Sequence, residues 1–485
     1  MGYTSAMKRV VVVGGGISGL ATAYRIVSGA EAEAIPLALT LLEGEPRLGG
    51  KIVTQRRDGF TVEGGPNGFL DGKPETLRLA RDLGLGDRLL PSSDAARKRF
   101  VFRHGELHAL PESPPAFFRS RLLSVPGRLR ILAEPFIRPA PPDLDESLAE
   151  FGARRLGPEA VDALLDPMVS GVYAGDPREL SVWACFPRIK ELERDYGSLI
   201  KALLTLQRER RKALASGAAP AAAAPGGGGP AGPSGKLTSF DGGTEVLVER
   251  LRQVLGERVR VGAGARAVVA NGAGGYRVIL ANGEALDADI AVLAVPAYAA
   301  ADLLAELAPA AAAAAREIGY APAAVVALGF ERSSVRHPLD GFGFLIPRTE
   351  GRRILGSLWT SSIYPGHRAP DGRVLLRTIV GGARNPEIAA LPADELVEVV
   401  RGELRSILGI EAPVVFREVF PWPVAIPQYN VGHRERVRRI DEAISPHTGL
   451  VITGNAYRGI GINDCTRDAE RAAGLVLESI RAGAA

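Results

Sequence analysis

The chain has 485 residues, of which 46% are hydrophobic and 24% are charged, a composition typical of a folded globular protein. This length exceeds what one hydrophobic core usually supports, so we expect two or three lobes. The 59 basic and 55 acidic residues leave a formal net charge of +4, which is too small to indicate a nucleic-acid partner.

Neither the cysteines nor the first residues indicate secretion. Cys185 and Cys465 are too few for a disulfide framework and lack the spacing of a metal site, which predicts a reducing compartment. Residues 1–6 lack the apolar core of a signal peptide, and Met7 could be the natural start. No apolar run reaches the roughly 18 residues that a transmembrane helix needs. We therefore expect a cytoplasmic protein, peripheral on the inner face of the cell membrane.

The chain begins with a predicted strand-helix-strand unit. Residues 8–13 are predicted to form a strand whose apolar residues 10–13 lead directly into glycines, as a buried parallel strand does. A helix over residues 17–28 and a second strand over residues 37–42 complete a unit of the usual size.

Residues 111–142 are rich in proline, with apolar and basic side chains intermixed. This pattern predicts a segment that lies on an anionic membrane surface, and the alternative is a solvated loop. Residues 143–212 are predicted to be helical, and residues 213–235 to be a loop of Ala, Gly, Pro and Ser. The membrane prediction depends on Phe117, Phe118, Leu122, Leu123, Ile131, Leu132, Phe136 and Ile137, and on Arg119, Arg121, Arg128, Arg130 and Arg138.

Regular structure resumes with a predicted helix at residues 244–255. Strands are predicted at residues 259–261, 267–269, 276–280 and 290–294, with a second set at 324–330, 343–346 and 374–380. A strand at 450–453 and a helix from about Asn463 close the chain. The economical fold is α/β, with a Rossmann-like lobe built from both chain ends, an inserted mixed-sheet lobe and a helical lobe. The predicted boundaries are 7–90, 91–212, 213–235, 236–300, 301–420 and 421–485.

Gly14, Gly16 and Gly19 form a G-x-G-x-x-G pattern between the first strand and the first helix. Such glycines permit a tight turn, close approach of a pyrophosphate, and close packing of helix against strand. Glu43 ends the second strand, where a carboxylate can accept hydrogen bonds from ribose hydroxyls. The context favours a dinucleotide site over a purely structural turn.

Two further segments favour a permanently held flavin over a nicotinamide. Arg47, Gly49 and Gly50 follow Glu43, and residues 63–68 read EGGPNG. Arg47 could offer a cation to the phosphates, and its alternative role is that of a solvated surface arginine. Near the end of the chain, residues 459–464 lead into the last helix, whose N-terminus would stabilise negative charge on reduced flavin. Capping of that helix by Asn463 or Asp464 is compatible with this role.

Four motifs together resemble the flavin-containing amine oxidase superfamily: GGGISGL at residues 14–20, E-x-x-x-R-x-G-G from Glu43, F-x-G-G-T at 240–244, and GNAYRGIGINDC at 454–465. Residues 98–100, 107–111, 341–343, Trp422 and 426–433, with the Asp464-Cys465 ending, resemble the protoporphyrinogen oxidase family over essentially the full chain.

The resemblance implies FAD as the cofactor. Its pyrophosphate, ribose and ribityl parts would be held by Gly14, Gly15, Gly16, Ile17, Ser18, Gly19, Glu43, Gly44, Arg47, Gly49, Gly50 and Lys51. Its isoalloxazine would be surrounded by Gly65, Pro66, Asn67, Gly68, Trp422, Ile460, Gly461 and Ile462. The adenine would meet the backbone of Ala267, where family members often carry valine.

The resemblance also implies a porphyrinogen substrate. Arg99 would pair with a propionate, and Phe342, Gly343, Leu345 and Ile379 would sandwich the macrocycle. An apolar site with a few cations suits such a ring. The alternatives are that Arg99 belongs to an exposed basic cluster, and that Phe342 and Leu345 are ordinary core residues.

No Ser-His-Asp, Cys-His or metal constellation is evident, so we expect no catalytic side chain and no metal. The expected reaction is oxidation of protoporphyrinogen IX to protoporphyrin IX in heme biosynthesis, with hydride transfer to flavin N5 and release of hydrogen peroxide from molecular oxygen. Coproporphyrinogen III oxidase, amine oxidase, carotenoid desaturase and a non-enzymatic flavoprotein remain alternatives. A homodimer is left open.

Overall fold

The structure is a computed structural model that describes residues 7–215, 235–272 and 274–482. The predicted tail at residues 1–6 lies outside the described residues. The predicted loop at 213–235 does so too, apart from three residues at its start and Gly235.

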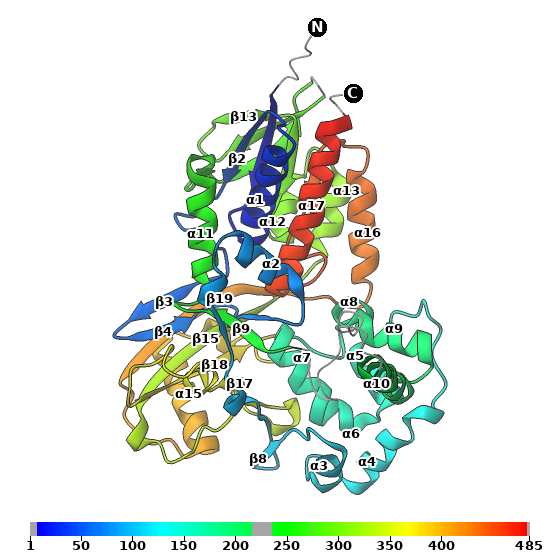
Figure 1. Ribbon diagram of the computed structural model, residues 1–485, viewed down its shortest axis with the longest axis vertical. Coiled ribbons are helices and arrows are strands. Elements are labelled where there is room, and N and C mark those ends of the chain that lie inside the picture. Colours follow the sequence, from blue (N-terminus) through cyan, green and yellow to red (C-terminus); the bar gives the residue numbers. More distant parts are fainter. Residues whose placement is uncertain (1–6, 216–234, 273, 483–485) are drawn as a thin grey trace.

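A five-stranded parallel sheet draws its strands from distant parts of the chain (Figure 1). Val10 and Val12 of its central strand face one buried cluster, and Val11 and Val13 face another. Burial on both faces explains why this strand is apolar at successive positions. The order is β10 (Val259–Arg260), β2 (Leu37–Leu42), β1 (Lys8–Val13), β14 (Ile290–Leu293) and β20 (Leu450–Ile452).

Helices and small sheets surround the parallel sheet. One cluster contains side chains of α1 (Ile17–Ala32), α2 (Pro74–Asp82), α11 (Glu245–Leu255) and α17 (Ile462–Ala482). The other contains α12 (Ala297–Leu303), α13 (Pro309–Arg316) and α16 (His433–Ile444), with strands β11 (Ala265–Ala270), β12 (Tyr276–Leu280) and β13 (Ala285–Ala288). The remaining short strands are β3 (Thr54–Arg57), β4 (Phe60–Glu63), β5 (Phe69–Leu70), β6 (Leu89–Pro91) and β9 (Leu237–Phe240).

The second large sheet of the structure is mixed and has seven strands. Its strand pairs are antiparallel except β16 with β7, which is parallel. Helix α15 (Ala393–Leu408) packs on one face through Val400 and Leu404, against Val326, Leu328 and Leu376. The order is β19 (Phe416–Pro427), β15 (Tyr320–Glu331), β18 (Arg373–Gly381), β17 (Ile354–Leu358), β16 (Gly343–Leu345), β7 (Arg99–Arg103) and β8 (Glu106–Ala109). The short helix α14 (Thr360–Ile363) follows β17.

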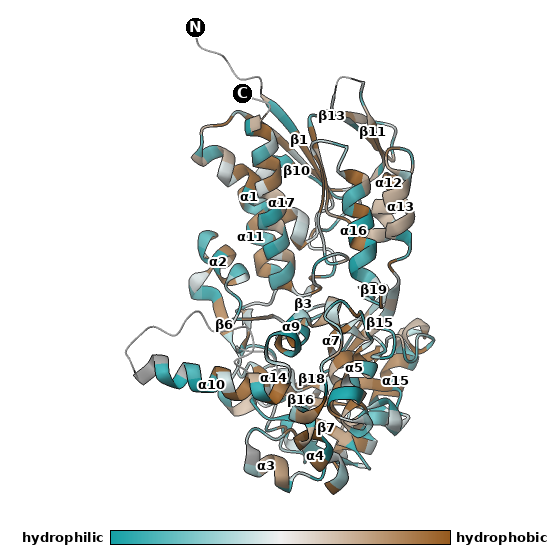
Figure 2. Ribbon diagram, turned by 90° about the vertical axis from the view of Figure 1, so that its right-hand side faces the viewer, coloured by the Kyte–Doolittle hydropathy of each residue, from teal (hydrophilic) through white to brown (hydrophobic). Residues whose placement is uncertain are grey.

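A helical region occupies much of residues 114–215, and α3 and α4 lie at the end of the molecule farthest from α1 (Figures 1 and 2). No described helix is both long enough and apolar enough to cross a bilayer. The helices are α3 (Pro114–Arg119), α4 (Val125–Leu132), α5 (Leu148–Arg155), α6 (Pro158–Ala160), α7 (Asp166–Tyr173), α8 (Val182–Cys185), α9 (Pro187–Tyr196) and α10 (Leu199–Ala215).

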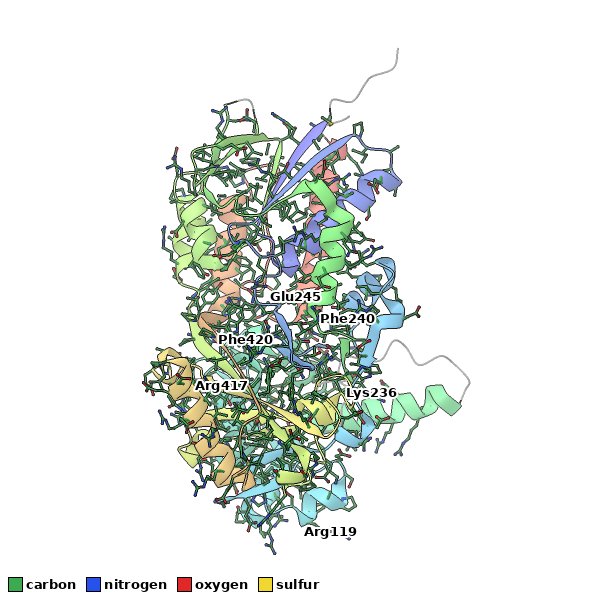
Figure 3. The ribbon with its side chains drawn as sticks, turned by 90° about the vertical axis from the view of Figure 1, so that its left-hand side faces the viewer. Arg119, Lys236, Phe240, Glu245, Arg417 and Phe420 are labelled. Atoms are coloured by element: carbon green, nitrogen blue, oxygen red, sulfur yellow. The ribbon has the colours of Figure 1, made fainter. Side chains whose placement is uncertain are left out.

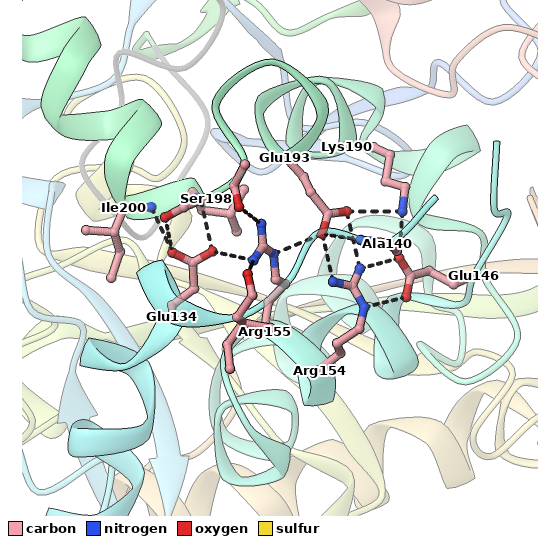
Figure 4. A network of polar contacts seen from close by, with 12 residues as sticks. Glu134, Ala140, Glu146, Arg154, Arg155, Lys190, Glu193, Ser198 and Ile200 are labelled. Atoms are coloured by element: carbon pink, nitrogen blue, oxygen red, sulfur yellow. Dashed lines mark hydrogen bonds and ion pairs between the residues drawn. The ribbon is translucent and has the colours of Figure 1, made fainter. Parts of the chain in front are cut away.

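An ionic cluster is buried in this helical region (Figure 4). Glu193 of α9 lies 2.7 Å from Arg154 and 3.0 Å from Arg155, both of α5, and 3.1 Å from Lys190. Glu134 lies 3.3 Å from Arg155. Glu146 completes the cluster at 2.6 Å from both Arg154 and Lys190, so three carboxylates balance three cations.

The mixed α/β class is as predicted, but the content of residues 91–212 differs from the prediction. Residues 99–109 form β7 and β8 and join the seven-stranded sheet instead of a helical lobe. Trp422, expected within the FAD-binding lobe, lies on β19 of that sheet. The domain boundaries themselves stay predictions.

Candidate functional site

The turn between β1 and α1 is closely packed on one side and open on the other. Gly14 has a φ of +109°, and a Cβ there would lie 2.4 Å from the Ala294 carbonyl oxygen. A Cβ on Gly19 would lie 1.8 Å from the Gly14 oxygen, so both positions require glycine. A Cβ on Gly16 would meet nothing within 4 Å. Gly16 also begins α1 without a side-chain cap, which leaves an open space at a helix N-terminus that suits a phosphate.

Glu43 is fixed directly beside this turn. Its carboxylate accepts hydrogen bonds from the Gly15 amide at 2.8 Å and from the Glu45 amide at 2.9 Å. The Ala263 amide binds the Glu43 carbonyl at 2.7 Å, which brings the segment before β11 to the same end of the sheet. Ala267 lies further along β11, half-buried and paired with Ile279.

Arg47 organises the turn that follows. Its guanidinium donates to the carbonyls of Leu48 and Ile52, both at 2.9 Å, and to that of Gly50. Arg47 is exposed, as the alternative of a solvated surface arginine expects, but its guanidinium is engaged by backbone carbonyls. The turn that Arg47 holds lies against the glycine turn between β1 and α1, because the Gly49 amide donates to the Gly15 oxygen at 2.8 Å.

The loop at residues 63–68 is anchored by a buried carboxylate. Glu63 accepts hydrogen bonds from Thr54 Oγ1 at 2.8 Å and from Thr244 Oγ1 at 2.7 Å, and Arg368 lies 3.8 Å away. Burial raises the pKa of Glu63, against the hydrogen bonds from Thr244. Through Thr244, the F-x-G-G-T motif thus binds Glu63 and holds this loop near the middle of the molecule. Figure 3 shows Phe240, Glu245 and Phe420 in this region.

Two polar side chains at this loop form no hydrogen bond or ion pair among the described residues. Asn67 is 8% exposed, and neither its Oδ1 nor its Nδ2 forms a hydrogen bond. Lys51 lies with its Nζ 5.8 Å from the centre of the Trp422 ring, and burial lowers the pKa of its amine. No carboxylate of the described residues pairs with it. These residues fit a ligand that carries both a polar ring edge and anionic groups.

The last loop meets the same region from the opposite end of the chain. Tyr429 Oη accepts a hydrogen bond from the Gly459 amide at 2.8 Å and donates to the Asn455 carbonyl at 2.6 Å. Helix α17 begins at Ile462, so Asn463 and Asp464 lie in its first turn and neither is the predicted N-cap residue. Asp464 Oδ2 accepts from the Gly461 amide at 3.2 Å, just before the helix. Between these contacts Ile460 is half-buried and Gly461 is exposed, while Ile462 is buried.

Cys465 follows this loop but is not suited to covalent chemistry. Burial raises the pKa of its thiol to about 12. Because the thiolate is the reactive form, this cysteine is inert near neutral pH.

The predicted substrate residues share one face of the seven-stranded sheet, opposite α15. The strand register places Leu345, Gly356 and Ile379 in one cross-strand row, and Arg99 and Gly343 in the next. Leu345 and Ile379 are half-buried, whereas their neighbours on the α15 side are buried. Phe344, not Leu345, is therefore the core residue of β16.

Arg99 differs from the basic residues beside it. Arg97 and Lys98 pair with Glu112 and Asp340 at 2.6 and 2.7 Å. Arg99 has no carboxylate partner among the described residues; its guanidinium carbon lies 5.3 Å from the centre of the Phe342 ring. Burial lowers its pKa. An unpaired, half-buried arginine on an apolar face is suited to a ligand carboxylate.

Two residues of this region were not predicted from the sequence. Arg377 of β18 donates from Nε to the Glu63 carbonyl at 2.7 Å, and Tyr429 holds the last loop as described. The available signal for Arg377 was a single basic residue inside an otherwise apolar strand. For Tyr429 the sequence offered no signal beyond its place in segment 426–433, which resembles the protoporphyrinogen oxidase family.

The chain is similar to known flavin-containing oxidoreductases over most of its length. A family model described as flavin containing amine oxidoreductase matches residues 17–477. The chain is 34% identical to coproporphyrinogen III oxidase of Bacillus subtilis, covering 94% of this chain and 95% of that one. It is 35% identical to the chloroplastic protoporphyrinogen oxidase of Nicotiana tabacum, covering 96% and 85%. A crystal structure from Exiguobacterium sp. 255-15, described provisionally as a protoporphyrinogen oxidase, superposes with a TM-score of 0.81 at 28% identity, covering 97% and 99%.

Proposed function

The chain belongs to the flavin-containing amine oxidoreductase family, with FAD as its cofactor, and we propose that it oxidises protoporphyrinogen IX to protoporphyrin IX in tetrapyrrole biosynthesis. The observation that carries the proposal is the unpaired Arg99 on an apolar sheet face that adjoins the loop at residues 63–68. When bound, FAD supplies a hydride acceptor, which molecular oxygen reoxidises with release of hydrogen peroxide.

The residues of this chain would bind and orient the two ligands. The turn at residues 14–19, Glu43, Arg47 with the glycines it positions, and Lys51 would hold the non-reacting part of FAD. The loop at 63–68, Trp422 and residues 460–462 would surround its ring, and Ala267 would meet the adenine. Phe342, Gly343, Leu345 and Ile379 would exclude water around the macrocycle, and Arg99 would bind one propionate.

Coproporphyrinogen III is the second candidate substrate, favoured by the similarity to the Bacillus subtilis enzyme over 94% of this chain. It carries more carboxylates than protoporphyrinogen IX and would need more unpaired cations. Arg97 and Lys98, which flank Arg99, are already paired with acids. This pairing favours protoporphyrinogen IX.

The deciding experiment is aerobic oxidation of the two porphyrinogens side by side, followed by porphyrin fluorescence and peroxide formation. We expect a preference for protoporphyrinogen IX, with peroxide formed in step with porphyrin. Preference for coproporphyrinogen III would establish the second candidate instead. Activity on neither, with FAD-loaded protein, would overturn the porphyrinogen proposal.

Arg99→Ala is expected to raise the KM for the porphyrinogen about 10- to 100-fold with little loss of kcat. A hydrogen bond to a charged group contributes about 1.5–3 kcal/mol, and each 1.4 kcal/mol is about tenfold in affinity. Steady-state kinetics would measure the effect. Arg97→Ala is the matched control, because Arg97 is exposed and already paired with Glu112. Equal effects of the two substitutions would contradict the role given to Arg99.

We further propose that the protein binds the inner face of the cell membrane through α3, α4 and the residues that follow. Leu122 and Leu123 of the predicted apolar set are buried, so they do not contribute. Arg119, Arg121 and Arg138 are exposed and have no described ion-pair partner. Figure 3 shows Arg119 at the end of the molecule remote from the parallel sheet. The exposed apolar side chains are Phe118, Val125, Leu129, Leu132 and Phe136.

Replacement of Phe118 and Phe136 by serine is expected to reduce co-sedimentation with anionic lipid vesicles several-fold. These are large apolar side chains, 54% and 89% exposed, whose insertion would bury apolar surface beside the arginines. Val254→Ser on α11, at an exposed apolar position of the other end of the molecule, should leave co-sedimentation unchanged. Unaltered sedimentation of the double variant would exclude this surface.

A further inference from the structure

The large sheet holds the loop at residues 63–68 by three successive carbonyl oxygens. Arg377 Nε donates to the Glu63 oxygen at 2.7 Å, and Arg377 Nη2 donates to the Gly65 oxygen. Between them, Trp422 Nε1 donates to the Gly64 oxygen at 2.8 Å. The Arg377 guanidinium therefore holds the carbonyls of Glu63 and Gly65, on either side of the Gly64 carbonyl that Trp422 holds.

Anchoring through the carbonyls leaves the amides of the loop available. The amides of Gly65, Asn67 and Gly68 donate to no acceptor among the described residues. The unpaired side-chain amide of Asn67 lies in the same loop. Asn67 is buried, and an unsatisfied buried donor is costly, so this loop is suited to donate to a ligand.

Arg377 also brings to this loop a charge that forms no ion pair with a described carboxylate, although Glu63 is close enough to raise the pKa of Arg377. Its side chain is buried and its two partners are neutral carbonyls. The other buried arginines of the described chain have a carboxylate within 4 Å: Arg155 has Glu134 at 3.3 Å, and Arg368 has Glu63 at 3.8 Å. No described carboxylate lies within that distance of Arg377. Burial lowers the pKa of Arg377 only to about 10, so the charge persists at neutral pH.

The Glu63 carboxylate does not remove this charge. It receives the hydroxyls of Thr54 and Thr244, and Arg368 lies 3.8 Å from it. If Glu63 is ionised, two arginines and one carboxylate leave one net positive charge near the loop. Because a buried, unpaired charge is unfavourable, an anion bound at the loop would be stabilised by it.

We propose that Arg377 is a positioning residue for the flavin: its fork fixes the loop at residues 63–68 with the amides presented to the ring, and its charge favours the reduced, anionic flavin over the oxidised form. The proposal rests on FAD binding at the site proposed above, but not on the identity of the porphyrinogen.

The test uses the FAD-loaded protein and two variants. Arg377→Met removes the charge at similar length, and Arg377→Lys keeps the charge but cannot bind two carbonyls at once. Arg373→Met is the matched control, because Arg373 lies on the same strand, is partly exposed and pairs with Glu331 at 3.0 Å. The flavin reduction potential would be measured by equilibration with reference dyes, and the FAD dissociation constant by titration of the apoprotein.

For Arg377→Met we expect the ratio of reduced to oxidised flavin affinities to fall about tenfold, equivalent to about 30 mV for a two-electron couple. For Arg377→Lys we expect a potential near that of the unchanged protein and a weaker FAD affinity. A Met variant with the potential of the Arg373→Met control would overturn the role of the charge.

Should the Met variant retain no FAD, the Lys variant decides. Unchanged FAD affinity in that variant would overturn the positioning role. None of these measurements uses a porphyrinogen, so their outcome is independent of the substrate assay.

Discussion

Gly16→Val is expected to weaken FAD binding at least about a hundredfold while leaving the fold intact. A side chain at this position would enter the open space at the start of α1, where the pyrophosphate would lie, without meeting protein atoms. Loss of about 3 kcal/mol of binding corresponds to this factor. The ratio of flavin to protein absorbance after purification would measure binding, and thermal unfolding of the apoprotein would measure stability.

Two other glycines make this experiment interpretable. Gly86 also has nothing within 4 Å of an added Cβ, so Gly86→Val should change neither FAD content nor stability substantially. Gly19→Ala would place its Cβ 1.8 Å from the Gly14 oxygen and should destabilise the apoprotein itself. A Gly16→Val protein that keeps its full flavin content would show that the pyrophosphate lies elsewhere.

Glu193→Gln is expected to lower the free energy of unfolding by about 3–5 kcal/mol. The substitution leaves the buried Arg155 and Lys190 and the partly exposed Arg154 with only Glu134 and Glu146 to balance them (Figure 4). Urea denaturation followed by helical circular dichroism would measure the loss. Glu191→Gln, which removes a partly exposed pair with Arg188, should cost less than about 1 kcal/mol.

Glu193 is also expected to make the stability of the folded protein sensitive to acid. Burial raises the pKa of Glu193, but hydrogen bonds from Arg154 and Lys190 outweigh it and the pKa is lowered. A carboxylate whose pKa is lower in the folded state stabilises the fold above its unfolded pKa and loses that contribution as the pH falls. The stability gap between the unchanged protein and Glu193→Gln should therefore narrow below about pH 4.3. A gap that stays constant to lower pH would contradict this role.

Local signals in the sequence were enough to predict the start of the parallel sheet. The strands at Lys8–Val13 and Leu37–Leu42 have the predicted bounds, because burial on both faces selects mostly apolar residues. The glycine turn was equally predictable, since its spacing reflects contacts within one strand-helix unit. Helix α1 runs to Ala32, four residues beyond the predicted end at residue 28, because Gly29 does not end the helix but lets it pack closely on α17, where an added Cβ would lie 2.5 Å from Leu477.

Features that depend on distant pairing were not predictable. Strand β7 carries Arg99 and Arg103, which suggested a basic surface cluster, and only its pairing with β16 makes it a strand of the large sheet. In the sequence, Arg377 is a single charged residue in an apolar strand, and its role depends on the loop at residues 63–68, which lies against it only in the folded chain. Both meanings arise from contacts between segments more than two hundred residues apart.

Strand β19 forms one edge of the seven-stranded sheet, and its prolines protect that edge from other chains. Pro421, Pro423 and Pro427 are separated by even numbers of residues, so their backbone nitrogens are on the same side of the strand. A proline has no amide hydrogen to donate. Further along, Arg57 donates to the Arg417 carbonyl at 2.8 Å and occupies an acceptor that would otherwise face outward. An extended segment from a neighbouring molecule therefore finds amides missing at the prolines and one carbonyl already bound, which hinders the addition of a strand. The strand that carries Trp422 thus also protects this edge of the sheet from aggregation.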